Sequence, residues 1–287
     1  MQIAWSGLSQ CYEFDTGEIM GGIQPFTNYH GICGLMHRDY MAGAVRHNKA
    51  FLNAEYYLRP GSGMVMYPRR LSLSREVAHD LTLDGVAIRF PAEPDFGLEM
   101  DLHYRPLGDA VDLKTTIRPS VDIRRFEVFF ASYIAGVFDE TWVPIANVEG
   151  ARAWTRLDNR EVINRTFGVA GNDLSRAMIQ DGRYGERDRG LHRDLEERDF
   201  SLPILAARDS SSGFTLVFLC DPVHTTYLTG QYHGWDTAHD WCYGGDLTAG
   251  KEMVTRTRMV YRCFPDARAL GTGIDELWAA FADPVFQ

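Results

Sequence analysis

The residue types best suited to chemistry gather in one stretch, Gln231 to Asp246, which reads Q-Y-H-G-W-D-T-A-H-D-W-C-Y-G-G-D. It places two imidazoles, His233 and His239, beside two carboxylates, Asp236 and Asp240. A carboxylate paired with an imidazole can move protons as a general acid or base. These four residues are therefore the predicted catalytic group. The alternative interpretation is a structured loop whose polar groups satisfy its own backbone.

Aromatic side chains stand among these polar groups, namely Tyr232, Trp235 and Trp241. The C–H face of a sugar ring can stack on an indole, while its hydroxyls bond to Asp and His side chains. The stretch is therefore typical of a carbohydrate site, with the aromatic residues in contact with the substrate.

The same stretch offers ligands for a divalent metal ion, because His233 and His239 can bind through nitrogen and the carboxylates through oxygen. The spacing of the two histidines, H-x5-H, matches no strong metal-binding template. Two expectations stay open: no cofactor, or one divalent metal ion at His233 and His239.

A second candidate group lies nearer the N-terminus. It contains His30 and His37 and the adjacent pair Arg69 and Arg70. Guanidinium groups can clamp a substrate oxygen or carboxylate. These four residues are predicted to help bind the substrate, although the two arginines could equally pair with neighbouring acids on the surface.

Composition limits the partners of the chain. Asp and Glu number 39 against 29 Lys and Arg, a formal net charge of -10. An acidic surface repels phosphates, so neither nucleic acid nor an anionic membrane is an expected partner. The five cysteines form no CxxC pair, which argues against a disulfide framework. No secretory signal and no membrane-spanning run is visible, which favours a cytoplasmic protein.

Several common catalytic motifs are absent: GxGxxG, GxxxxGK[ST], GxSxG and HExxH. The sequence thus gives no support for common dehydrogenases, kinases, α/β hydrolases or zincin proteases.

Most of the chain has the patterning of β-strands. Residues 98–104 and 111–117 alternate apolar and polar side chains on either side of a Gly/Asp turn, which predicts an antiparallel hairpin. Residues 72–90 and 203–220 predict two further hairpins, 126–134 a covered central strand, and 253–264 the last long strand. Strands at this density imply two packed sheets.

The predicted organisation is one β-sandwich domain over residues 1–287. It comprises N-terminal strands and loops (1–60), a highly charged excursion (172–199) and a short C-terminal helix (273–283). The charged excursion suits a solvated surface segment, a lid or an oligomer contact. An edge strand or the helix could support a homodimer.

The sequence resembles the galactose mutarotase-like group, the large β-supersandwich of aldose epimerases. The resemblance rests on the strands of residues 71–134, on the chain length, and on the ending L-T-A-G-K-E (Leu247 to Glu252) before a final strand. It implies a mostly β, two-sheet antiparallel supersandwich with few short helices and a sugar-binding cleft. In aldose epimerases a His acts as acid and a Glu shortly before the glycine turn acts as base.

This sequence departs from that pattern. It has no Glu between Gln231 and Lys251, and the N-H-x-x-F-N-L-like histidine motif is missing. Asp236 or Asp240 could replace the glutamate, or the chain could be a divergent branch with other sugar chemistry.

The leading expectation is an enzyme of the epimerase or mutarotase type that acts on a small-molecule carbohydrate by acid/base chemistry. His233 or His239 would be the acid/base and Asp236 or Asp240 its partner. Two alternatives remain: a metal-assisted carbohydrate lyase or hydrolase, and a non-catalytic sugar-binding sandwich protein.

Overall fold

The computed structural model describes every residue except 27–28, 70–76, 147–151, 158–164, 185–191 and 283–287. The described residues form three sheets, in which neighbouring strands are antiparallel apart from one parallel pair, β13 and β14. This confirms the predicted mostly β class.

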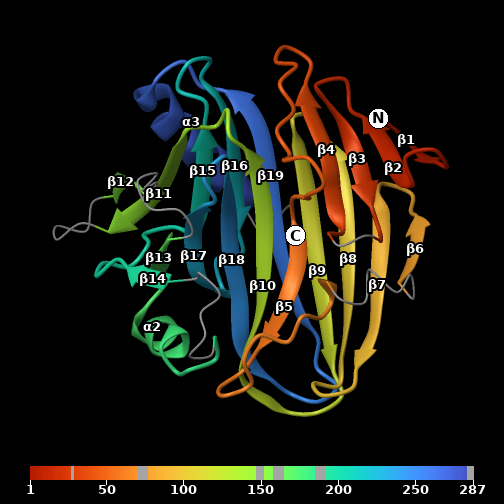
Figure 1. Cartoon of the computed structure of the whole chain (residues 1–287), viewed down its shortest axis with the longest axis vertical. Helices are drawn as coiled ribbons and strands as arrows, with labels where there is room; N and C mark the ends of the chain where they lie inside the picture. Colours follow the sequence, from red (N-terminus) through yellow and green to blue (C-terminus); the bar gives the residue numbers. More distant parts are fainter. Residues whose placement is uncertain (27–28, 70–76, 147–151, 158–164, 185–191, 283–287) are drawn as a thin grey trace.

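One sheet has six strands and carries the candidate site. Its order is β14 (His192–Leu195), β13 (Arg165–Ala170), β17 (Thr225–Tyr232), β18 (Asp236–Leu247), β10 (Ile123–Ala135) and β5 (Asn53–Leu58). The long strands β10 and β18 run side by side through its middle (Figure 1). The predicted covered strand at 126–134 is confirmed, because β10 pairs with a neighbour on each side.

The second sheet has nine strands. Its order is β12 (Arg152–Arg156), β11 (Glu140–Ala146), β15 (Ile204–Arg208), β16 (Phe214–Cys220), β19 (Met253–Cys263), β9 (Ala110–Pro119), β8 (Leu98–Leu107), β7 (Val86–Glu93) and β6 (Ala78–Leu81). The predicted hairpins β8–β9 and β15–β16 and the last strand β19 are confirmed. The β6–β7 hairpin confirms the C-terminal part of the 72–90 prediction, and residues 72–76 lie outside the described residues.

A third sheet of four strands is formed by β1 (Gln2–Ser6), β2 (Cys11–Asp15), β3 (Ile19–Gln24) and β4 (Gly31–His37). An isolated bridge between Ile32 and Phe51 joins this sheet to the chain just before β5. In Figure 1 it lies beside β5 and in front of β7, β8 and β9.

The main core fills the space between these layers. It contains Phe130 and Trp241 of the six-stranded sheet, Leu102 and Phe218 of the nine-stranded sheet, and Ile32 of the third. Burial of such apolar surface is the main force that holds the layers together. Each central strand therefore has one face in this core and a second face turned outward, and the outward face of the six-stranded sheet is the one that carries the candidate site.

Two helices are described. Helix α2 (Asp173–Ile179) begins after Asn172, whose side chain accepts a hydrogen bond from the Ser175 amide at 2.9 Å. Helix α3 (Ala267–Ala282) is longer than the predicted C-terminal helix and packs on the outer face of the nine-stranded sheet through Leu270, Ile274 and Phe281. Neither helix is long and apolar enough to cross a membrane, within the residues that the structure describes.

Candidate functional site

The candidate site is the outward face of the six-stranded sheet near the N-terminal end of β18. The register pairs Asp240 with Ala131 and Asp236 with Ala135, so both carboxylates share a face with alternate residues of β10. The small alanines leave space around carboxylates that are almost fully buried. The register thus places the two carboxylates on the outward face of the six-stranded sheet, although they are buried.

Glu55 is the centre of a hydrogen-bonded network on this face. It is 1% exposed and sits at an irregularity in the pairing of β5 with β10. Its Oε1 accepts hydrogen bonds from Tyr133 Oη at 2.9 Å and Asn53 Nδ2 at 2.8 Å. Its Oε2 lies 3.3 Å from Arg69 Nη1. A buried carboxylate with these partners is held in a fixed orientation.

Two cations pack against aromatic rings beside Glu55. Arg69 donates a hydrogen bond to Tyr29 Oη at 2.7 Å, and its guanidinium lies 4.3 Å from the centre of that ring. The Lys49 amine lies 4.0 Å from the Tyr29 ring and 4.5 Å from the Tyr133 ring. Each contact combines an ionic group with the negative face of a ring.

The electrostatics of this cluster centre on Tyr133. Burial, followed by the negative charges of Glu55 and Asp240 among other nearby groups, raises the pKa of Tyr133 well above its ordinary value. The phenol therefore keeps its proton at neutral pH and donates a hydrogen bond to Glu55. Because both Glu55 and Asp240 act on the Tyr133 phenol, Asp240 belongs to the same cluster as Glu55.

His233 lies at the edge of this cluster, in the turn between β17 and β18. Its imidazole stacks on the Tyr133 ring with centroids 6.1 Å apart, and its Nδ1 lies 3.4 Å from Asp236 Oδ1. The His233 side chain is 20% exposed, whereas that of Asp236 is 1% exposed. The other Asp236 oxygen accepts a hydrogen bond from Arg46 Nη1 at 2.6 Å. An accessible imidazole is thus backed by a fixed, buried carboxylate.

The aromatic residues predicted to contact the substrate have different positions. Trp235 is 68% exposed beside His233, with the Arg46 guanidinium 5.2 Å from its ring centre. Tyr232 is half-buried and donates a hydrogen bond to the Gly234 carbonyl. Trp241 is fully buried and stacks on Phe130 in the main core. The structure therefore brings Trp235, but not Trp241, to the candidate site.

His239 points to the opposite face of the sheet from Asp240, because neighbouring residues of a strand alternate in direction. It is fully buried, hydrogen-bonds Thr141 Oγ1 at 3.0 Å and packs against Phe218. Burial lowers its pKa to about 3. The imidazole is a neutral part of the core and does not join His233.

His30 lies on the core side of β5, behind the candidate site, and His37 lies away from the site. His30 is fully buried against Phe90, and its Nε2 accepts a hydrogen bond from the Ala54 amide at 3.0 Å. His37 packs between Phe214 and Tyr261. Of the predicted arginines, Arg69 is in the cluster and Arg70 lies outside the described residues.

Among the described residues, no group of three or more His, Cys, Asp or Glu side chains could hold a metal ion. His233 and His239 face opposite sides of their sheet. The expectation of a divalent ion at these two histidines stays a prediction.

Sequence reasoning missed most of the Glu55 network as site residues. These are Tyr29, Lys49, Asn53, Glu55 and Tyr133. The available signal was Asn53 and Glu55 within the apolar run F-L-N-A-E-Y-Y-L, because a charged residue is almost never fully buried unless it is paired.

No protein-family model and no curated protein sequence matches the chain. Solved structures do match. A putative aldose 1-epimerase from Escherichia coli covers 88% of this chain and 99% of its own, with TM-score 0.56 and 7% identity. A galactose mutarotase related enzyme from Lactobacillus acidophilus covers 89% and 98%, with TM-score 0.53 and 8% identity.

A third match is to part of a larger enzyme. The α-N-acetylgalactosaminidase NagBb from Bifidobacterium bifidum, solved with GalNAc, covers 94% of this chain but only 39% of its own, with TM-score 0.56 and 13% identity. Together these matches show that the chain has the galactose mutarotase-like β-supersandwich fold, as the sequence predicted. At such low identity they show the fold alone.

Proposed function

We propose that the outward face of the six-stranded sheet binds a carbohydrate and catalyses an epimerase- or mutarotase-type reaction by acid/base chemistry. The observation that carries the proposal is the pair of His233 and Asp236, in which the imidazole also stacks on Tyr133. Two further carboxylates, Glu55 and Asp240, lie near that phenol. The fold supports it, since similar structures include a putative aldose 1-epimerase and a galactose mutarotase related enzyme.

Charge balance favours a neutral ligand such as a sugar. The carboxylates Glu55 and Asp236 are each paired with an arginine. The cluster also holds Asp240, and the Lys49 amine over the Tyr133 ring brings the count to three cations for three carboxylates. The face therefore presents hydrogen-bonding groups without a large net charge. Trp235, exposed at the edge, offers a platform for the apolar face of a sugar ring.

In the proposed reaction His233 exchanges a proton with the ring oxygen of the sugar, and Asp240 accepts the proton of the anomeric hydroxyl. Asp236 orients the imidazole and stabilises its charged form, while Arg46 holds Asp236 in place. Glu55 is already bound by Tyr133, Asn53 and Arg69, so it positions Tyr133 rather than moving protons itself.

The test is exchange NMR of a panel of aldoses and aldose derivatives with the purified protein, in the presence and absence of a chelator. We expect catalysed exchange between anomers or epimers for at least one sugar. His233→Gln should reduce the catalysed rate by about 10²–10⁴-fold, since a positioned proton-transfer group contributes that much. His47→Gln, which changes an exposed histidine, is the matched control.

The outcomes distinguish acid/base catalysis by His233 from the non-catalytic and the metal-assisted alternatives. Loss of tenfold or less in His233→Gln would exclude His233 as the acid/base. Sugar binding without exchange would make the chain a non-catalytic sugar-binding protein. Exchange that disappears with the chelator would show that the reaction needs a metal ion and would contradict the metal-free acid/base mechanism.

A further inference from the structure

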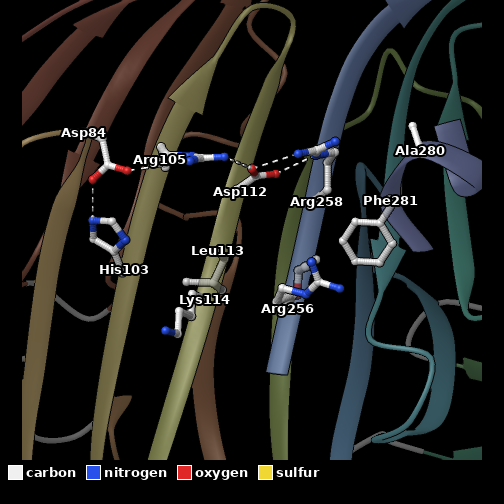
Figure 2. A pocket seen from close by; sticks show the side chains of 11 residues that line it. Asp84, His103, Arg105, Asp112, Leu113, Lys114, Arg256, Arg258, Ala280 and Phe281 are labelled. Atoms are coloured by element: carbon white, nitrogen blue, oxygen red, sulfur yellow. Dashed lines mark hydrogen bonds and ion pairs between the residues drawn. The ribbon is translucent and has the colours of Figure 1, made fainter. Parts of the chain in front are cut away.

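A cavity lies on the outer face of the nine-stranded sheet, on the far side of the sandwich from His233. Its volume is about 260 Å³. Strands β8, β9 and β19 form its floor, and the last turn of α3 forms one wall through Ala280 and Phe281 (Figure 2). The acid/base site described above makes no use of it.

In one row of side chains across this floor, a carboxylate is paired with the arginines on both sides of it. Asp112 on β9 stands between Arg105 on β8 and Arg258 on β19, its register partners. It pairs with Arg258 at 2.6 Å and with Arg105 at 3.1 Å. The other lining carboxylate, Asp84, lies 3.4 Å from His103 and 3.7 Å from Arg105. Both carboxylates are therefore already paired.

The next row is cationic. Lys114 on β9 stands directly opposite Arg256 on β19, with His103 on its other side. Like charges directly opposite each other destabilise a sheet. Neither side chain makes an ion pair or hydrogen bond with another described residue, and the Arg256 guanidinium lies 5.3 Å from the centre of the Phe281 ring. In Figure 2 the two cationic ends diverge along the floor of the cavity.

The cavity is thus a concentration of positive charge on an acidic protein. Arg105, Lys114, Arg256 and Arg258 carry four positive charges against two negative charges on Asp84 and Asp112, so the lining has a net charge of +2 with His103 neutral, whereas the whole chain carries -10. The two charges without a carboxylate partner are those of Lys114 and Arg256.

We propose that this cavity binds the dianionic phosphate group of a small phosphate monoester, and that the flexible side chains of Lys114 and Arg256 turn toward each other to contact it. A phosphate dianion matches the net charge of the lining, and it would remove the repulsion between the two side chains. A guanidinium can bind two phosphate oxygens at once, while a lysine acts as a point charge. Phe281 and Ala280 offer an apolar wall to the ester carbons. The cavity lies just below the usual range of ligand pockets, which restricts the ligand to a small molecule.

The test is isothermal titration calorimetry of the whole chain with glycerol 3-phosphate and with inorganic phosphate, at constant ionic strength set with chloride. We expect saturable binding of one glycerol 3-phosphate per chain, tighter than inorganic phosphate. Lys114→Gln and Arg256→Gln should each weaken binding about tenfold or more, because each removes a charge-assisted hydrogen bond. Lys251→Gln, at an exposed lysine in a turn outside the cavity, should leave affinity unchanged.

Thermal unfolding supplies a second readout. In chloride, Lys114→Gln and Arg256→Gln should keep or raise Tm, because each removes a like-charge contact; in glycerol 3-phosphate they should gain less Tm than the wild type. Absence of saturable binding, or equal weakening by Lys251→Gln, would overturn the site. Equal affinity for glycerol 3-phosphate and inorganic phosphate would overturn the proposal that the ligand is an ester and would leave a site for free phosphate.

Discussion

At the scale of single residues, the face of a strand decides what a histidine can do. His233 lies in a turn, keeps 20% of its side chain exposed and touches a carboxylate. His239 and His30 are fully buried, and burial lowers the pKa of each to about 3. The sequence grouped His233 with His239 because both stand among carboxylates, but composition carries no information about which face each residue occupies.

The buried histidines make stability depend on pH. An unfolded histidine has a pKa near 6.5, so the unfolded chain binds protons at its histidines below that pH. In the folded protein His239 and His30 stay neutral until about pH 3. Stability must then fall as pH drops from about 6.5 towards 3, by up to about 1.4 kcal/mol per pH unit for each residue. Urea unfolding between pH 7 and 4.5 measures this slope.

His239→Gln should be less stable than the wild type at pH 7, because it disturbs the core, but its stability should depend less steeply on pH. His47→Gln, at an exposed position, should keep the wild-type slope. Parallel slopes for wild type and His239→Gln would show that His239 titrates in the folded protein, contrary to its burial.

At the scale of elements, the sequence revealed strands whose two faces differ. Strand β8 alternates buried Leu98, Met100, Leu102 and Tyr104 with more exposed residues, so its hairpin with β9 was predictable. Strand β18 is buried on both faces for most of its length. Its outward face carries Asp236 and Asp240, while its core face carries His239 as well as Trp241. Because polar residues stand on both faces, no alternation is visible, and a structured loop was an equally open interpretation of the stretch.

The same sheet packs side chains over glycine at one point. The Tyr227 ring on β17 lies over Gly168 on β13, where a Cβ would collide with the ring. Gly168→Ala should therefore cost about 1–3 kcal/mol through overpacking. Gly230→Ala, on the adjoining strand, places its Cβ 3.4 Å from Thr141 Cγ2, an ordinary contact, and should cost much less. Denaturant unfolding of both variants compares them; equal costs would count against the packing argument.

At the scale of the whole molecule, a buried ion pair between Arg183 and Glu127 connects the charged excursion predicted at 172–199 to the six-stranded sheet. The exposed charges of this excursion suggested a solvated segment, yet Arg183 is fully buried. The Arg183 guanidinium lies 2.6 Å from Glu127 of β10 and 2.8 Å from Asp181. Burial lowers the pKa of Arg183, but Asp181 and Glu127 outweigh it and the pKa is raised. Composition could not reveal which of the many charged residues in this segment is buried in an ion pair.

Breaking this pair should strongly destabilise the molecule. Arg183→Met leaves Glu127 charged and fully buried without its guanidinium, and we expect a loss of about 3–5 kcal/mol in the free energy of unfolding. Adding Glu127→Gln removes the uncompensated charge and should recover part of that loss, which a double-mutant cycle by urea unfolding measures. Arg198→Ala breaks the exposed pair with Glu196 in the same segment and should have a much smaller effect. If Arg183→Met cost no more than Arg198→Ala, the excursion would be held by its apolar contacts, Ile179 and Tyr184 against the sheet, rather than by charge.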